Sequence, residues 1–259
     1  MTAQLKSASV GQTLVLTLHN PEQRNALDPA MYSAGVEALN GAETNREVRS
    51  VVITGDGRWF CAGGSLQRLA ANRHEAPSVQ AGSIDALHSW IEAIRTFPKP
   101  VIAAVEGAAA GAGFALALAC DLIVAARDAI FAASYSNVAL SPDGGLSWHL
   151  AQALPRQLAG EWLMGGARLD AARLHALGLV NTLCEPGQSL AQAQEWADRL
   201  NARAPNALAS IKELLNEASG STLAEHLPRE RDRFVQNLHH ANAGVGIEAF
   251  LGKTPPLYS

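Results

Sequence analysis

The sequence predicts an α/β core followed by an α-helical C-terminal region, and three observations lead to that fold class. Up to about residue 186, short apolar runs that suit buried strands alternate with stretches of helical spacing. Within this part, two strands each run into a turn of small residues that opens a helix. Beyond Pro186 only helical stretches follow. We therefore expect a core over residues 1–190 and a helical region over residues 191–259.

The first strand and helix signals lie before residue 70. Apolar runs predict strands at 13–18 and 51–54. Asp28 followed by Pro29 is typical of an N-cap and the first helical position, so a helix should run to about residue 40. After the second strand, the segment WFCAGG leads into a helical pattern that begins near Ser65. This segment is the first strand–turn–helix junction.

The second junction lies between Lys99 and Asp121. A β-branched apolar run predicts a buried strand at 100–105, and residues 107–113 are only Gly and Ala. An apolar helix should follow at 114–120. The first amides of a helix have no partner within it, so a bare turn before a helix can offer N–H groups to an anionic oxygen. A tightly packed Gly/Ala crossing without a ligand would have the same sequence.

The remaining elements follow the same pattern. The polar segment 71–83 predicts a mobile loop, and apolar spacing predicts a helix at 84–97. After the second junction, the turn SPDGG leads into a helix from Leu146, and Asp170 should cap a helix that Gly178 ends. Further strands are expected at 122–125, 129–132 and 179–184, and helices at 190–202, 206–217, 222–239 and 246–253.

Composition narrows the class of protein. Of 259 residues, 48% are apolar and 17% charged, which is typical of a folded chain and not of a disordered one. A net charge of −4 with both signs interspersed gives no indication of nucleic-acid or membrane-surface binding. The three cysteines lack metal-ligand spacing and suit reduced, buried thiols, and no signal-peptide pattern is visible. We therefore expect a cytoplasmic protein without a metal site.

The two junctions, with PEQRNALD before them and SPDGG after them, resemble the crotonase superfamily of enoyl-CoA hydratase/isomerase-like proteins. The resemblance covers essentially the whole chain. It implies a ClpP/crotonase spiral of ββα units, and C-terminal helices that assemble a homotrimer or a dimer of trimers. It also implies an acyl-CoA thioester as substrate and no further cofactor.

The resemblance assigns backbone and side-chain contacts to this substrate. It implies that two backbone N–H groups, those of Gly64 and Ala112, hold the thioester oxygen. Such donors must touch an oxygen, so Gly and Ala are suitable because no bulky side chain screens them. The charges among the implied CoA contacts could equally be solvated surface residues. These contacts are Arg24, Ala26, Ala62, Gly63, Leu66, Gly111 and Lys253.

Acid–base residues differ from those of the best-known hydratases in the family. The two hydratase Glu positions hold Ala115 and Tyr135, whereas Asp143 stands where isomerase-type members carry an acid. One carboxylate suffices to take a proton from one carbon and return it to another, so the resemblance favours an enoyl-CoA isomerase that uses Asp143. The alternative for Asp143 is a turn residue whose carboxylate caps the following helix.

Two other functions stay open. Aryl-CoA dehalogenases of the superfamily, such as those acting on 4-chlorobenzoyl-CoA, carry a His at the position of His88 and a nucleophilic Asp at that of Asp143. Their Trp stands at the position of Tyr135, which here could donate a hydrogen bond or simply line the acyl pocket. His88 could also be an ordinary helix residue. Loss of both hydratase carboxylates is also compatible with a protein that binds CoA esters without turnover.

Overall fold

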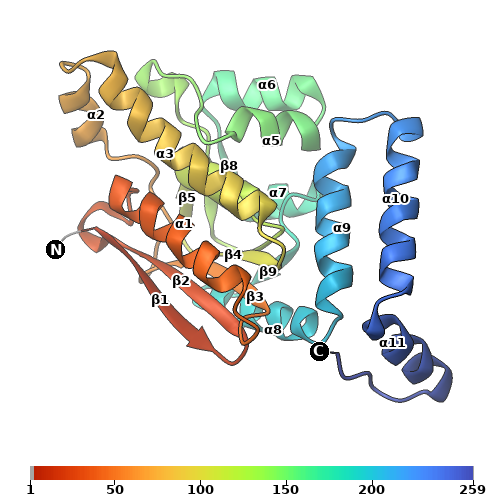
Figure 1. Cartoon of the computed structure of the whole chain (residues 1–259). Coiled ribbons are helices and arrows are strands. Elements are labelled where there is room, and N and C mark those ends of the chain that lie inside the picture. Colours follow the sequence, from red (N-terminus) through yellow and green to blue (C-terminus); the bar gives the residue numbers. More distant parts are fainter. Residues whose placement is uncertain (1–2, 259) are drawn as a thin grey trace.

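Two β-sheets, surrounded by helices, carry the core of the protein (Figure 1). The computed structural model describes residues 3–258. The larger sheet has the strand order β1-β2-β3-β4-β6-β9, and the smaller has the order β5-β7-β8. The strands are β1 (Gln4–Val10), β2 (Thr13–His19), β3 (Ser50–Gly55), β4 (Val101–Val105), β5 (Ala108–Ala110), β6 (Leu122–Ala126), β7 (Ile130–Ala132), β8 (Arg168–Asp170) and β9 (Thr182–Cys184).

Parallel pairing explains why the central strands read as unbroken apolar runs. From β2 to β9 every neighbouring pair in the larger sheet is parallel, and only β1 pairs antiparallel. All five residues of β4 are buried, because a parallel sheet is covered on both faces. β4 and β5 are separated by only two residues, so the chain passes from the larger sheet straight into the smaller one.

Helices enclose both sheets and extend beyond them. They are α1 (Pro29–Glu43), α2 (Leu66–Asn72), α3 (Pro77–Thr96), α4 (Ala112–Ala119), α5 (Leu146–Ala153), α6 (Arg156–Gly165), α7 (Ala171–Ala176), α8 (Ser189–Asn201), α9 (Pro205–Ala218), α10 (Leu223–Leu238) and α11 (Ala241–Gly252), with short 3-10 turns at η1 (Pro21–Gln23) and η2 (Ser136–Val138). The predicted caps are confirmed: Asp28 accepts from the Ala30 amide, and Asp170 accepts from the Arg173 amide at 2.6 Å. Within residues 3–258, no helix is both long and apolar enough to cross a membrane.

The two faces of the larger sheet have separate apolar cores. Val51 and Ile53 of β3 face a core shared with α1, α3 and α4, whereas Val52 between them faces Ala193 and Ala197 of α8. Since α8 packs on the sheet, the helices that extend away from it begin at α9. The division of the chain at residue 190 stays a prediction.

Helices α9 and α10 lie side by side at one edge of the molecule, with α11 below them (Figure 1). Lys212 of α9 ties this region to the core: its Nζ donates to the Asp121 carboxylate at 2.8 Å and to the Ile94 carbonyl at 2.9 Å. The same carboxylate accepts the Val101 amide at the start of β4. Large apolar side chains nonetheless remain exposed on these helices, namely Ile211, Leu215, Leu223, Leu227, Phe234, Val235, Leu238, Val245, Ile247, Phe250 and Leu251.

The prediction of an irregular loop over residues 71–83 is wrong for its second half. Helix α3 begins at Pro77, seven residues before the predicted start, with Pro at its first position. Residues 77–83 lack apolar periodicity because this end of α3 is exposed or only half-buried. Apolar periodicity therefore marks only the part of a helix that is buried, and it gives no sign of an exposed first turn.

Candidate active site

Two strand–turn–helix junctions, distant in sequence, are fastened to each other by backbone hydrogen bonds. Cys61 and Ala109 form an isolated parallel bridge. In it the Cys61 amide donates to the Ala108 carbonyl, and the Ala110 amide donates to the Cys61 carbonyl, each at 2.9 Å. The turn after β3 and the turn after β4 therefore lie against each other, as the resemblance implies.

Glycines allow this close approach. Gly63 has φ +88°, and a Cβ there would lie 2.6 Å from the Ala110 carbonyl oxygen and 3.4 Å from the Ala112 amide nitrogen. A Cβ on Gly113 would lie 2.7 Å from the Cys61 sulfur. Real Cβ atoms do not tolerate such contacts, so any side chain at either glycine would push the two turns apart.

Two amides are left unpaired where the turns meet. Ala112 is the first residue of α4, and the amides after it, of Phe114 and Ala115, already donate to the Gly111 carbonyl. Within residues 3–258, neither the Ala112 nor the Gly64 amide donates to a backbone or side-chain acceptor. Both residues line one cavity. Two free amide donors on residues that line one cavity are suited to binding an anionic oxygen.

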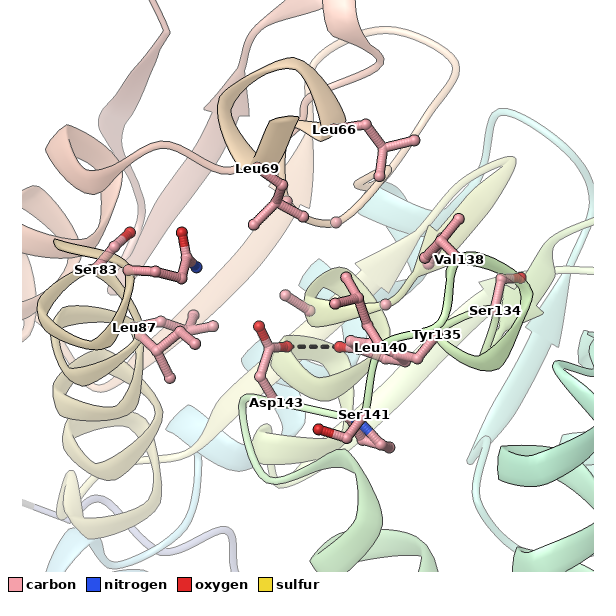
Figure 2. A pocket seen from close by; sticks show the side chains of 18 of the residues that line it. Leu66, Leu69, Ser83, Leu87, Ser134, Tyr135, Val138, Leu140, Ser141 and Asp143 are labelled. Atoms are coloured by element: carbon pink, nitrogen blue, oxygen red, sulfur yellow. Dashed lines mark hydrogen bonds between the residues drawn. The ribbon is translucent and has the colours of Figure 1, made fainter. Parts of the chain in front are cut away.

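The cavity has a volume of about 600 Å³ and mostly aliphatic walls. Figure 2 shows Leu66 and Leu69 of α2 on one side, Leu87 of α3 on a second, and Val138 and Leu140 on a third. Such a volume accommodates a small acyl group with part of its carrier. Asp143 is the single carboxylate among the described residues that line it.

Asp143 is held by Tyr135 in this cavity. The Tyr135 hydroxyl donates to Asp143 Oδ1 at 2.6 Å (Figure 2). Burial, and then the negative charge of Asp143, raise the pKa of Tyr135 far above its usual value, so the phenol keeps its proton. A Cβ on Gly111 would lie 3.6 Å from the Tyr135 oxygen, so this pair adjoins the free Ala112 amide.

Helix capping does not explain Asp143. The N-cap of α5 is Gly145, with φ +81° and no side-chain capping bond. The Asp143 carboxylate accepts from Tyr135 instead, whereas its backbone carbonyl accepts from the Leu146 amide. The turn is thus built by glycine conformation and main-chain bonding, and it leaves the Asp143 side chain directed at the cavity.

The other predicted residues fall into two groups. Ala62, Gly63, Leu66, Gly111 and His88 line the same cavity as Asp143, with His88 exposed on α3. Arg24, Ala26 and Lys253 do not line it. Arg24 lies over the Trp59 ring at 5.4 Å, in an adjoining hollow that Ala62 also lines. Ala26 is buried, and Lys253 is exposed just after α11.

Sequence reasoning missed several polar residues of the cavity, among them Tyr32 and Arg68. Arg68 Nη1 donates to Asp28 Oδ2 at 3.1 Å, and Nη2 donates to the Tyr32 hydroxyl at 3.5 Å. A signal was available, because Arg68 lies in the first turn of the helix that follows Gly64. Its partners come from α1, and this pairing is invisible in sequence.

The spiral α/β core, with a cavity beside its two junctions, defines a protein of the crotonase-like fold class. Residues 8–259 match the family described as enoyl-CoA hydratase/isomerase, and the chain belongs to that family. Among curated relatives it is 33% identical to the 1,2-epoxyphenylacetyl-CoA isomerase of Escherichia coli, over 95% of this chain and 94% of that protein. It is also 31% identical to the 2,3-dehydroadipyl-CoA hydratase of the same organism, over 95% and 94%.

A solved structure gives a nearer likeness. The crystal structure of an enoyl-CoA hydratase from Polaromonas sp. JS666 is 67% identical in sequence and superposes with a TM-score of 0.98. The match covers 99% of this chain and all of that one. The expected superfamily and fold are therefore confirmed.

His149, on α5 just after the Asp143 turn, should make stability pH-dependent. Burial, and then the charge of Arg95, lower the pKa of His149 from 6.5 to about 4. The unfolded chain then binds more protons than the folded one between these values, so stability should be full above pH 6.5 and fall as the pH drops toward 4. The free energy of unfolding, measured in urea, should fall between about pH 7 and about pH 5. This fall should be about 2 kcal/mol larger in the wild type than in His149→Gln. Equal differences in both proteins would contradict this assignment.

Proposed function

We propose that this protein is an enoyl-CoA isomerase that moves a double bond through a thioester enolate. Asp143 is the proton-transferring group, and the amides of Gly64 and Ala112 bind the thioester oxygen. The observation that carries this proposal is that both unpaired amides and a single carboxylate line one cavity, within the described residues. CoA thioester is the substrate, and the mechanism needs no other cofactor.

The proposed reaction is two proton transfers. Asp143 removes a proton from the carbon next to the thioester carbonyl, the double bond shifts into conjugation, and negative charge develops on the carbonyl oxygen. The two amides stabilise this charge more in the transition state than in the ground state, by roughly 2.7–4 kcal/mol for each donor. Asp143 then returns the proton to the far carbon of the displaced double bond. Tyr135 holds Asp143 during both transfers.

Isomerisation is favoured over hydration because water addition in this family uses two Glu residues. Ala115 and Tyr135 occupy their positions, and Ala115 is fully buried. A Cβ on Gly144 would lie 3.0 Å from the Ala115 methyl, so the turn before α5 packs directly on this residue. Relatives named isomerase and hydratase are both similar to this chain, which supports acyl-CoA chemistry without choosing between the two.

The rest of the CoA molecule follows the resemblance. Ala62, Gly63, Leu66 and Gly111 contact the thioester arm, while Arg24 and Ala26 lie where the family holds the nucleotide end. Arg24 is exposed in the hollow that adjoins the cavity at Ala62, which supports a role in binding phosphate. Three buried, unpaired cysteines support a reducing compartment, and we place the protein in the cytoplasm.

A substrate panel tests the proposal. Wild-type protein is incubated with crotonyl-CoA, a 3-enoyl-CoA and 4-chlorobenzoyl-CoA, and products are separated by liquid chromatography. Conversion of the 3-enoyl to the 2-enoyl ester, without comparable hydration of crotonyl-CoA, is the expected result. Chloride release would instead identify a dehalogenase with Asp143 as nucleophile and His88 assisting. Thermal stabilisation by these esters without turnover would identify a CoA-ester-binding protein.

We also propose that α9, α10 and α11 assemble a homotrimer or a dimer of trimers. The exposed side chains of Phe234, Phe250 and Leu251 on these helices support this, because large exposed apolar patches mark interfaces. In this assembly Lys253 would reach the CoA phosphates bound by a neighbouring subunit. Sedimentation should give three or six times the chain mass of 27.2 kDa, and Phe234→Glu should reduce it. A monomeric wild type would contradict the proposal.

A further inference from the structure

The end of the cavity formed by α1 and α2 carries a fixed guanidinium. Arg68 of α2 is anchored at one nitrogen, Nη1, by Asp28, while Nη2 donates to the Tyr32 hydroxyl. Asp28 is itself fixed, because its other oxygen accepts the Ala30 amide at 3.1 Å. The side chain of Arg68 is 23% exposed and lines the cavity. It is therefore held in place and does not swing freely into solvent.

Two donors at this end have no acceptor within the described residues. Arg68 Nε is buried and unpaired. The Tyr32 oxygen accepts from Arg68, so its own O–H is left without a partner, although the residue is only 3% exposed. Burial raises the pKa of Tyr32, so this hydroxyl keeps its proton. Leaving buried donors unpaired is costly, so a group that supplies acceptors to both would be bound favourably.

These donors come from α1 and α2, whereas Asp143 lies in the loop before α5. Figure 2 shows Leu69, the neighbour of Arg68 on α2, across the cavity from Asp143. An acyl group whose thioester oxygen meets Gly64 and Ala112 would extend along α2, where Arg68 lies four residues beyond Gly64. A hydrocarbon tail would leave both donors unmatched. A permanent cation beside a phenol whose O–H has no acceptor suits a carboxylate, which accepts several hydrogen bonds.

We propose that the acyl group bound here ends in a carboxylate, held by Arg68 and Tyr32, so that the substrates are CoA monoesters of dicarboxylic acids. This inference rests on the proposed function and specifies its substrate class. Asp143 stays available for proton transfer, because the substrate carboxylate is bound by side chains of α1 and α2.

Matched pairs of 3-enoyl-CoA esters of increasing chain length test the inference, one member of each pair ending in a methyl group and the other in a carboxylate. At one chain length or more, kcat/KM should be at least about tenfold higher for the carboxylate-ended member. Arg68→Gln should abolish this ratio, and Tyr32→Phe should reduce it. Arg73→Gln, at the exposed end of the same helix, should preserve it.

Binding of saturated esters gives a second measurement that needs no turnover. Calorimetry with methyl-ended and carboxylate-ended acyl-CoAs should reproduce the preference in wild type and its loss in Arg68→Gln. If both members of every pair bind and react equally, and Arg68→Gln leaves their ratio unchanged, the inference is overturned while the isomerase proposal stands. If no ester of either kind binds, the proposed function fails together with the inference.

Discussion

Asp143→Asn should lower kcat for isomerisation by roughly 10²–10⁴-fold, the usual contribution of a positioned acid–base group. Asn keeps the shape of Asp and retains an oxygen that can accept from Tyr135, so the cavity should survive. It cannot take up a proton from carbon, and within the described residues no other carboxylate lines the cavity. KM should change much less than kcat, because the amides of Gly64 and Ala112 still bind the thioester oxygen.

Two further variants serve as comparisons for Asp143→Asn. Ser141→Ala changes a polar residue of the same loop and cavity without touching a carboxylate, and it should stay near wild-type activity. Tyr135→Phe removes the hydrogen bond to Asp143 and should cost roughly 10–100-fold, since a bond to a charged group contributes about 1.5–3 kcal/mol. Steady-state kinetics with a 3-enoyl-CoA measures all three. Isomerisation at wild-type rate by Asp143→Asn would refute the mechanism.

Main-chain features of the site were the most predictable from sequence. An amide that must touch a ligand oxygen needs a small side chain beside it, and this requirement is legible as Gly and Ala at 63–64 and 107–113. The structure shows why glycine is needed there: Gly63 has a positive φ, and Gly113 packs directly on Cys61. Helix starts at Asp28 and Asp170 were predictable for the same local reason, because a cap acts within three residues.

Elements that face solvent were less predictable. Strand β1 is exposed along nearly its whole length, and its only sheet neighbour is β2. It therefore has no apolar alternation that would mark it in sequence. The start of α3 at Pro77 was missed for the same reason. Strand β1 is determined by its backbone pairing with β2, and the start of α3 by the proline at its first position. Hydrophobic periodicity indicates neither feature.

Side-chain partnerships within the site depend on tertiary structure. Tyr135 and Asp143 are eight residues apart and meet because the 3-10 turn η2 and the left-handed Ala139 that ends it reverse the chain between them. Arg68 meets Asp28 across 40 residues. Resemblance identified Asp143 by position, but only the packed structure showed that Tyr135 holds it and that Arg68 and Tyr32 line the same cavity.

The backbone donor at residue 112 can be removed without disrupting the helix that carries it. Ala112 is the first residue of α4, the one helical position where Pro is readily accepted because the N–H has no helical partner. A proline disfavours the α region for the residue that precedes it. Gly111 has φ +51° and ψ −123°, which lies outside that region, so its conformation is compatible with a following proline. Ala112→Pro should therefore fold, with a thermal midpoint close to that of the wild type.

Catalysis by Ala112→Pro should nonetheless fall by roughly 10²–10³-fold in kcat, the cost of deleting one oxyanion donor. Because the proline ring also occupies space near the thioester oxygen, a second variant separates the two effects. Replacing Ala112 with L-lactic acid converts its amide to an ester, which deletes the N–H and adds no atoms. If this ester variant shows the same loss, charge stabilisation by the Ala112 amide is responsible. If it isomerises a 3-enoyl-CoA as fast as wild type, the enolate oxygen is held elsewhere and the two junctions serve only to pack the core.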